Sequence, residues 1–352
     1  MPLHFRALAE ELVRRGHRVV LLVDGQQLAL EDKEANPAIY TWPSRRPTKV
    51  RDALFLYRLV KRYRPGCLVA NFGADNWMTT IGWLMRVPCR INWYHTLDDQ
   101  IATDAASPKW KLTLLRLRKR LVYRLMTQMV PVSQAASEDA QRSYGIAENK
   151  CQVFHNALID PVPGLDFDKP DPRRVVCVGR LSPSKGQDVV IRALCSLKDT
   201  VPDLCVEFIG DGPTKKALLA LAKNLAVEDR CRFVGALSHD KVIRMMASAY
   251  ATIVPSRSEA FGLVGIESLA VGTPVIGSLT GGLIETIRDG VDGFLVPPDD
   301  PVSLANKLRL MLSTPALRNS MSRNARERFL SRFESRKIVN TQATWLEGIV
   351  GS

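Results

Sequence analysis

The chain has 352 residues, 46% of them hydrophobic, and a formal net charge of +13 at pH 7. A single hydrophobic core usually stops growing at roughly 250 to 300 residues, so this length predicts two domains. The seven cysteines are odd in number and include no Cys-x-x-Cys pair, which argues against a disulfide framework or a metal site and favours a reducing cytoplasm.

The chain opens with the pattern of an amphipathic helix. Its apolar side chains recur at i, i+3, i+4 and i+7, at Phe5, Leu8, Ala9 and Leu12. Gly16 stands where a helix stop needs a left-handed residue, and the apolar run 18–23 predicts a strand after it. No run of the chain approaches the roughly 20 apolar residues of a membrane-spanning helix, and the start lacks an apolar signal core. We therefore expect a soluble or peripheral protein.

His95 is the candidate functional residue of the N-terminal half. It lies in Trp93-Tyr94-His95-Thr96, directly after an apolar-rich segment, 87–92, that predicts a strand. Ligands of open parallel sheets bind at the carboxyl ends of the strands. A lone histidine is more often a packed residue than a ligand contact, so the residues alone favour a structural role for His95.

The segment 109–125 concentrates positive charge. Its cations are Lys109, Lys111, Arg116, Arg118, Lys119, Arg120 and Arg124. The apolar residues between them are Leu112, Leu115, Leu117, Leu121, Val122 and Leu125. This pattern fits a basic amphipathic helix that lies on an anionic membrane surface, and equally a solvated helix with a buried apolar stripe. Nucleic acid is a weaker alternative, because no aromatic-interleaved recognition motif or zinc-finger spacing accompanies the charge.

The boundary between the domains is expected in a proline-rich stretch. Its prolines, at 161, 163, 170 and 172, exclude a long helix. We expect an N-terminal domain over 1–160, a linker over 161–174 and a second domain over 175–330. A C-terminal helix in 331–352 is expected to pack back toward the N-terminal domain. Strands and helices alternate along the chain, which predicts parallel sheets and an α/β fold.

A basic loop follows the predicted strand 175–178. The sequence runs Val175-Val-Cys-Val-Gly179-Arg180-Leu-Ser-Pro-Ser-Lys185-Gly186, with two cations five positions apart. The planar guanidinium of Arg180 and the compact ammonium of Lys185 are suited to neutralising a leaving diphosphate. In a chain with 49 Lys and Arg this could also be an ordinary basic surface loop, and only its place directly after a strand argues otherwise.

Two carboxylates, Glu259 and Glu267, lie eight positions apart across a predicted junction between a loop and a helix. The strand 251–254 ends before Glu259, and the helix opens over 261–270, so the pair spans on the order of 12 Å if helical. A nucleotide sugar carries hydroxyls at both ends and a diphosphate between them, and the N–H groups that begin a helix favour an anion. Gly262 permits close backbone approach there. The alternative is two solvated acids on an ordinary helix.

Five segments in the same order along the chain resemble the retaining glycosyltransferases of family 4, which have the two-domain fold called GT-B. The segments are 175–186, 208–213, 256–274, 281–285 and 289–299. The resemblance covers nearly the whole chain. It implies two Rossmann-like α/β domains with parallel sheets that face a cleft.

The resemblance also implies a set of site residues. They are Gly179, Arg180, Lys185, Glu259, Phe261, Gly262, Leu263 and Glu267, with His95 from the N-terminal domain. Arg180 and Lys185 would bind the donor diphosphate with the backbone amides of 261–263. Glu259 and His95 would face the transferred sugar, and Glu267 would hold the ribose. The family works without a bound metal, and the donor, expected to be a UDP- or GDP-sugar, is a substrate and not a cofactor.

The implied reaction is the transfer of a sugar to an acceptor hydroxyl with retention at the anomeric carbon. The expected acceptor is a carbohydrate or a lipid-linked molecule of cell-envelope polysaccharide, glycolipid or lipid-linked glycan synthesis, and the expected place is the cytoplasm or the cytoplasmic membrane face. The alternative is a non-catalytic relative that binds nucleotide sugar or regulates another protein.

Two departures from the family pattern accompany the resemblance. Members normally open with a buried strand and a Gly-rich loop, whereas here Met1-Pro2-Leu3 runs straight into a helix, which predicts a first domain without its first strand and with lower stability or activity. The usual Asn-Gly-Val-Asp is replaced by Asn156-Ala-Leu-Ile-Asp160, so neither Asn156 nor Asp160 is assigned a role.

Overall fold

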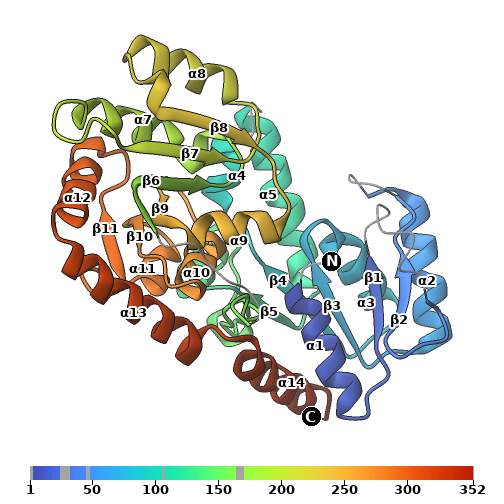
Figure 1. Ribbon diagram of the computed structural model, residues 1–352. Helices are drawn as coiled ribbons and strands as arrows, with labels where there is room; N and C mark the ends of the chain where they lie inside the picture. The colour runs from blue at the N-terminus through green and yellow to red at the C-terminus, as the bar shows by residue number, and fades with distance from the viewer. Residues whose placement is uncertain (1–2, 24–31, 45–47, 105–107, 164–169, 352) are drawn as a thin grey trace. The chain divides into compact units, whose positions relative to one another are not determined.

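The computed structural model describes residues 3–23, 32–44, 48–104, 108–163 and 170–351, which form two compact units (Figure 1). Unit 1 contains Met1–His95, Ser107–Ile159 and Ser335–Ser352, and unit 2 contains Thr96–Ala106 and Asp160–Glu334. Unit 2 therefore includes a short segment from within the range expected for the N-terminal domain. Met1, Pro2 and part of the expected linker lie outside the described residues.

Unit 1 contains two small parallel sheets with helices around them. Its strands are β1 (Val20–Val23), β2 (Ala38–Thr41), β3 (Cys67–Asn71), β4 (Cys89–Tyr94) and β5 (Gln128–Pro131). Its helices are α1 (Leu3–Arg14), α2 (Val50–Tyr63), α3 (Asp75–Leu84), α5 (Lys109–Arg124), α6 (Gln134–Tyr144) and α14 (Ser335–Gly351). One sheet pairs β1 with β2, and the other has the order β3-β4-β5. The predicted first helix and the strand after it are confirmed, and Gly16 between them has a φ of +92°, as its role as a helix stop requires.

The helices α1 and α14 are joined by ionic contacts within unit 1. The Arg15 guanidinium donates to Glu11 Oε1 at 2.8 Å and to Glu347 Oε2 at 2.7 Å. The second oxygen of Glu347 lies 2.9 Å from Nε2 of His17. Further along, the rings of Phe154 and Trp345 meet edge to face. The last helix of the chain is therefore an integral part of unit 1.

Unit 2 is a doubly wound α/β domain. Its strands are β6 (Asp171–Val178), β7 (Cys205–Ile209), β8 (Cys231–Gly235), β9 (Ala249–Val254), β10 (Val275–Ser278) and β11 (Gly293–Val296). Its helices are α4 (Asp98–Asp104), α7 (Gln187–Ser196), α8 (Lys215–Asn224), α9 (His239–Ala247), α10 (Leu263–Ala270), α11 (Leu283–Thr286), α12 (Pro301–Ser313) and α13 (Pro315–Arg332). The six strands form one sheet in the order β11-β10-β9-β6-β7-β8, with every neighbouring pair parallel. The predicted α/β fold with parallel sheets is confirmed.

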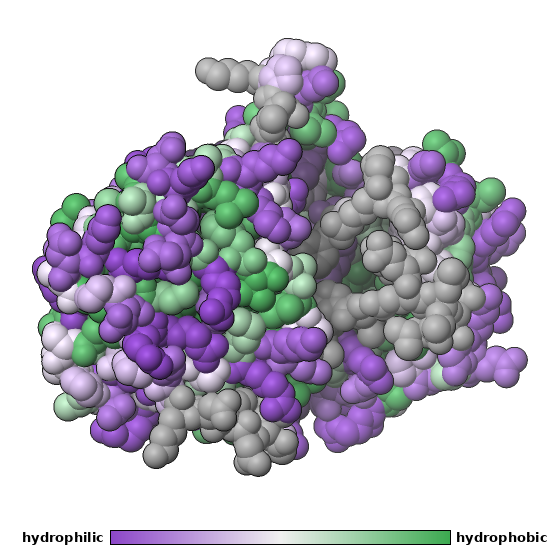
Figure 2. Space-filling view, turned by 45° about the horizontal axis from the view of Figure 1, so that its top comes forward, coloured by the Kyte–Doolittle hydropathy of each residue, from purple (hydrophilic) through white to green (hydrophobic). Residues whose placement is uncertain are grey.

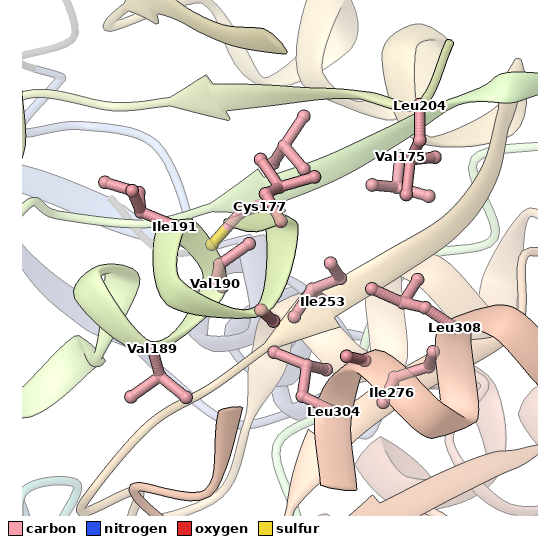
Figure 3. Close-up of a cluster of buried hydrophobic side chains, with 14 of the residues drawn as sticks. Val175, Cys177, Val189, Val190, Ile191, Leu204, Ile253, Ile276, Leu304 and Leu308 are labelled. Atoms are coloured by element: carbon pink, nitrogen blue, oxygen red, sulfur yellow. The ribbon is translucent and has the colours of Figure 1, made fainter. Parts of the chain in front are cut away.

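The core of unit 2 lies on both faces of this sheet. Figure 3 shows one face, where Val175 and Cys177 of β6 and Ile253 of β9 pack against α7 and α12. The intervening Val176 points to the opposite face, where it packs with Met246 of α9. Because successive side chains of a strand alternate between faces, a strand covered on both sides is apolar throughout, as the run 175–178 is.

The seven cysteines are free thiols. Within the described ranges, no helix is both long and apolar enough to cross a membrane. Figure 2 shows one face of the molecule, on which hydrophilic residues surround smaller hydrophobic areas.

Arg230 is a buried cation that binds three backbone carbonyls of unit 2. Its guanidinium donates to the carbonyl oxygens of Leu204 at 2.9 Å, Leu194 at 3.3 Å and Val201 at 2.6 Å. These carbonyls lie in the last turn of α7 and in the segment that leads into β7. Two of them also accept backbone hydrogen bonds, from the N–H groups of Leu197 and Leu204, so Arg230 adds a second donor there and ties the end of α7 to the start of β7.

We expect Arg230→Met to lower the free energy of unfolding of unit 2 by about 2 kcal/mol or more, because it removes three hydrogen bonds from a charged donor to buried carbonyls. Chemical denaturation followed by circular dichroism measures this. Arg192→Met, at an exposed arginine on α7, is the matched control and should stay within about 0.5 kcal/mol of the wild type. Equal midpoints for the two variants would contradict the assignment.

His4 is a buried base of unit 1. Its Nδ1 accepts a hydrogen bond from the backbone N–H of Ala157 at 3.2 Å, and its ring packs edge to face against Phe5 and Trp93. Its Nε2 is buried without a hydrogen-bond partner among the described residues. Burial lowers the pKa of His4 to about 4, so the folded state holds the neutral imidazole at pH 7.

Because the unfolded His4 binds a proton near pH 6.5 and the folded one only near pH 4, unit 1 should lose stability as the pH falls through this window. The shift corresponds to about 3 kcal/mol at most. Urea unfolding of the wild type and of His4→Gln between pH 8 and pH 4.5 tests this. The variant should show a shallower decline on acidification. Parallel curves for the two proteins would exclude His4 as the source.

Candidate functional site

The loops that follow β6 and β9 begin at one point of the unit 2 sheet. The strands β6, β7 and β8 run toward one edge in chain order and β9, β10 and β11 toward the other, so the order reverses between β6 and β9. In doubly wound sheets ligands bind at the carboxyl ends of the strands beside such a reversal. The two motifs that the sequence singles out, 179–186 and 255–262, are these two loops.

Lys185 and Glu259 meet across these loops. The ammonium of Lys185 donates to Oε2 of Glu259 at 2.7 Å, and the hydroxyl of Ser256 donates to the same oxygen at 3.0 Å. Both side chains are partly buried, with 22% and 13% of their surface exposed. Oε1 of Glu259 has no hydrogen-bond partner within the described part of the chain. The pair therefore presents one cation and one unused carboxylate oxygen.

Glycines allow the loops to pack this closely. Gly186 has a φ of +65°, and a Cβ atom there would lie 2.1 Å from the carbonyl oxygen of Pro255. Gly281, with a φ of +48°, would place a Cβ atom 2.0 Å from the carbonyl oxygen of Glu259. The next residue, Gly282, donates its N–H to that oxygen at 2.9 Å. Any side chain at these glycines would push apart the loops after β6, β9 and β10.

Glu267 has a partner that the sequence did not indicate. It lies on α10, and its Oε1 is 3.0 Å from Nε2 of His239, the first residue of α9. The hydrogen bond with Glu267, reinforced by the charges of Glu267 and Asp240, raises the pKa of His239. Glu259 and Glu267 thus have separate partners. A lone histidine after Ser238 has no spacing that would have identified it.

Arg180 is exposed and stands apart from the Lys185–Glu259 pair. Its backbone carbonyl accepts a hydrogen bond from the Gln187 side chain at 3.0 Å, which fixes the chain as it leaves Gly179. In the described ranges its guanidinium has no recorded ion pair or hydrogen bond. The structure therefore leaves this cation available to an anion and does not bring it into contact with Glu259.

The segment 261–263 forms the entry to α10. Phe261 is buried, and its ring packs against Phe333. Gly262, with a φ of +90°, is the N-cap, and Leu263 is 43% exposed. The first N–H groups of any α-helix have no partner within the helix, so those of Leu263 and Val264 are oriented to receive an acceptor or an anion.

Arg257 supports the basic loop from one side. Its guanidinium binds both carboxylate oxygens of Asp188, at 2.9 and 2.8 Å, and one of Asp299 at 2.6 Å. Its backbone N–H donates to the Ser184 carbonyl at 2.8 Å. Arg257 lies inside the motif read from the sequence, yet its partners are 69 and 42 positions away. Sequence spacing could not have revealed them.

Asp104, at the end of α4, supports the same loop. Its carboxylate accepts from the Ser184 N–H at 3.0 Å, from the Ser184 hydroxyl at 2.9 Å and from the Ser182 hydroxyl at 3.2 Å. These bonds explain why 96–104 belongs to unit 2. Asp104 carries no sequence signal of this role.

The motif at 289–299 is structural. Asp292 is fully buried and accepts the Arg288 N–H at 2.7 Å, and Asp289 accepts the Leu295 N–H at 2.9 Å. The acidic pair at 299–300 is likewise used: Asp299 binds Arg257, and Asp300 caps α12 through the N–H groups of its first turn. Across the described residues no group of three or more His, Cys, Asp or Glu side chains could hold a metal ion.

His95 lies in unit 1, directly after β4. His95 is mostly buried, and its ring packs edge to face against Phe5 with ring centroids 5.9 Å apart. Burial, aided by the nearby His4, lowers the pKa of His95 to about 3, so the imidazole is neutral at pH 7. Its place at a strand's carboxyl end is as predicted.

Comparison with known protein families matches nearly all of the chain to two models. Residues 2–159 match the model described as Glycosyltransferase Family 4, and residues 166–328 match the one described as Glycosyl transferases group 1. The first range ends at residue 159, just before the linker expected over 161–174, and the second range begins at residue 166, within that linker.

Among curated proteins, the chain is 39% identical over 160 residues to the D-inositol 3-phosphate glycosyltransferase of Acidothermus cellulolyticus. It is 35% identical over 172 residues to the glycogen synthase of Mycobacterium tuberculosis. These alignments cover 43% and 49% of this chain, which spans only 36% and 42% of the relatives' own length. A third relative, the glycosyltransferase MJ1607 of Methanocaldococcus jannaschii, is 26% identical over 351 residues, 93% of this chain and 88% of the relative.

Solved structures share the fold over almost the full chain. The sucrose-phosphate synthase of Thermosynechococcus elongatus superposes with a TM-score of 0.80 at 22% identity, covering 99% of this chain and 93% of the other. HepE of Anabaena in complex with UDP-glucose gives 0.76 at 20% identity, covering 97% and 94%.

The two family models together match residues 2–159 and 166–328, and solved structures share the fold over almost the full chain. The chain therefore belongs to the family 4 glycosyltransferases of the GT-B fold.

Proposed function

We propose that the chain transfers a sugar from a nucleotide-sugar donor to a hydroxyl of a carbohydrate or lipid-linked acceptor, with retention at the anomeric carbon. The observation that carries the proposal is the Lys185–Glu259 pair at the reversal of strand order in unit 2. HepE, which shares the fold, has been solved with UDP-glucose, which supports a nucleotide sugar as the donor class.

Lys185 and Glu259 would bind different parts of a donor. The charges of Lys185 and Glu259 neutralise each other at 2.7 Å. A diphosphate would compete for the ammonium, and the exposed Arg180 and the first N–H groups of α10 would add positive potential. Oε1 of Glu259 would accept a hydrogen bond from the sugar. We assign the donor diphosphate to Lys185 and Arg180, and the sugar to Glu259.

The reaction breaks the bond between the anomeric carbon and a diphosphate oxygen, whose electron pair stays on the diphosphate. The acceptor oxygen forms its bond on the same face, and its proton leaves with the diphosphate. Positive charge beside the departing group stabilises the oxocarbenium-like transition state. Glu259 and Glu267 have separate partners on separate elements, unlike the two facing carboxylates of a retaining glycosidase, so we assign no nucleophile.

Glu267 is proposed to hold the ribose. One of its carboxylate oxygens is engaged by His239 at 3.0 Å, which orients the other toward a vicinal diol. His95 is proposed to approach the sugar from unit 1 as a neutral imidazole. The donor itself, a UDP- or GDP-sugar, requires no further cofactor, because Lys185 and Arg180 supply the charge that a metal ion would otherwise provide.

We further propose that the acceptor belongs to cell-envelope polysaccharide, glycolipid or lipid-linked glycan synthesis. The chain would then act in the cytoplasm, with peripheral contact between 109–125 and the cytoplasmic face of the membrane.

Lys185→Ala should lower turnover by about 100-fold or more, because charge on the leaving diphosphate loses its closest cation. Release of nucleoside diphosphate from a panel of UDP- and GDP-sugars measures this. Lys185→Arg should retain part of the activity. Lys215→Ala, at a partly exposed lysine of the same unit, is the control. Unchanged turnover in Lys185→Ala would remove this residue from the site.

Glu267→Ala should weaken nucleoside diphosphate binding by about 10- to 100-fold, through loss of hydrogen bonds to the ribose. His239→Gln should weaken binding less. Because Glu267 raises the pKa of His239, wild-type affinity should fall as the pH rises and the imidazolium deprotonates, and this dependence should be absent in His239→Gln. Isothermal titration calorimetry at pH 6 and pH 9 measures both effects. The same pH dependence in wild type and His239→Gln would contradict the pairing.

A further inference from the structure

The helix α5 presents an apolar stripe to solvent. Four large side chains recur at spacings of four, three and four residues, which places them on one face of a helix. They are Trp110, Leu114, Leu117 and Leu121, and they are 64%, 60%, 54% and 54% exposed. We call them the α5 stripe.

The opposite face of α5 holds the helix to unit 1. Tyr123 is buried, and its ring meets Tyr144 of α6 edge to face at 5.2 Å. The Arg120 guanidinium donates to the Ser143 carbonyl at 3.0 Å. The sequence suggested a single interleaved set of apolar residues, but the structure divides it: Leu112 and Val122 are partly buried, whereas the stripe residues point outward. The stripe is thus not needed for packing within unit 1.

Cations flank the stripe on both sides. At 100° per residue, the stripe occupies an arc of about 60°, with Lys111 and Arg118 next to one edge and Arg124 near the other. The helix contains no Asp or Glu. A narrow apolar face with cations on both sides is the pattern of a helix that lies in the interface of an anionic membrane.

We propose that α5 docks on an anionic lipid bilayer, with the α5 stripe at the boundary of head groups and acyl chains and the flanking cations on the lipid phosphates. Trp110, whose ring is also covered by the Lys111 ammonium at 5.6 Å, suits the interface because its apolar ring carries a polar N–H. The inference deepens the membrane contact of 109–125 in the proposed function, and it rests on that function for its purpose, which is to bring the enzyme to lipid-linked acceptors.

Two other occupants fit the charges less well. If a second copy of the chain docked through the same stripe, the flanking cations of the two copies would face and repel each other. Nucleic acid would use the cations but leave four large apolar side chains in water. A lipid surface with acidic head groups satisfies both the stripe and its flanks.

The test is flotation of the full chain with two kinds of vesicle. One contains phosphatidylcholine alone, and the other also contains about 30% phosphatidylglycerol, which makes its surface anionic. We expect binding to the anionic vesicles only, reduced at least about 10-fold by Leu114→Gln with Leu117→Gln, and weakened by salt. Leu219→Gln with Leu310→Gln, at exposed leucines of unit 2, is the matched control and should float as the wild type does.

Three results would overturn the docking: no flotation of the wild type, equal flotation of the stripe variant, or a concentration-dependent dimer in sedimentation that the stripe variant abolishes. Calorimetric binding of nucleoside diphosphate to the same preparations separates this inference from the proposed function. The stripe variant should keep wild-type nucleotide affinity, which also shows that it is folded. Vesicle binding without any nucleotide binding would count against the proposed donor site and leave the docking intact.

Discussion

The parallel pairing of β6 with β9 is the constraint on which the candidate site depends. Because the strand order reverses there, two loops that are distant in the sequence leave the sheet side by side, one carrying Lys185 and the other Glu259. The 2.7 Å contact between them depends on the two loops leaving the sheet beside each other. Gly186 and Gly281 lie where these loops contact each other, and a side chain at either position would force the loops apart. The candidate site therefore forms only because the backbone brings these loops close together.

A second layer of ionic contacts holds the basic loop in shape. Asp104 and the backbone of Arg257 both form hydrogen bonds with Ser184, and the guanidinium of Arg257 binds Asp188. None of these contacts involves Lys185 or Arg180. The loop with the two cations proposed for the donor diphosphate is therefore held by groups that need not themselves meet a substrate. This arrangement resembles the support that precise binding sites generally require, in which neighbouring hydrogen bonds restrict the rotamers and loops of the contacting residues.

The sequence was informative where the relevant information is local. The strand 175–178, the loop after it and the helix before Ala270 follow from apolar runs, glycines and helix-capping preferences. Their bounds differ: β6 begins at Asp171, within the linker expected over 161–174, and α10 begins at Leu263, two residues after the predicted start. The partners of Glu267 and Arg257 could not be predicted, because the pairing of side chains from separate elements depends on how those elements pack. The outward face of α5 was ambiguous for a related reason. Apolar residues occur nearly all round that helix, so only its contacts with α6 decide which of them remain in water.

The chain path through the two units has a consequence for how the protein is made. Unit 1 includes α14, which leaves the ribosome after all of unit 2, and Glu347 on that helix pairs with Arg15, more than 300 positions earlier. Unit 2, including its early segment with Asp104, is translated in full before α14 emerges. During synthesis unit 2 is therefore completed while unit 1 still lacks α14, and one face of α1 stays uncovered until that helix emerges. Unit 1 begins before most of unit 2 but is completed after it.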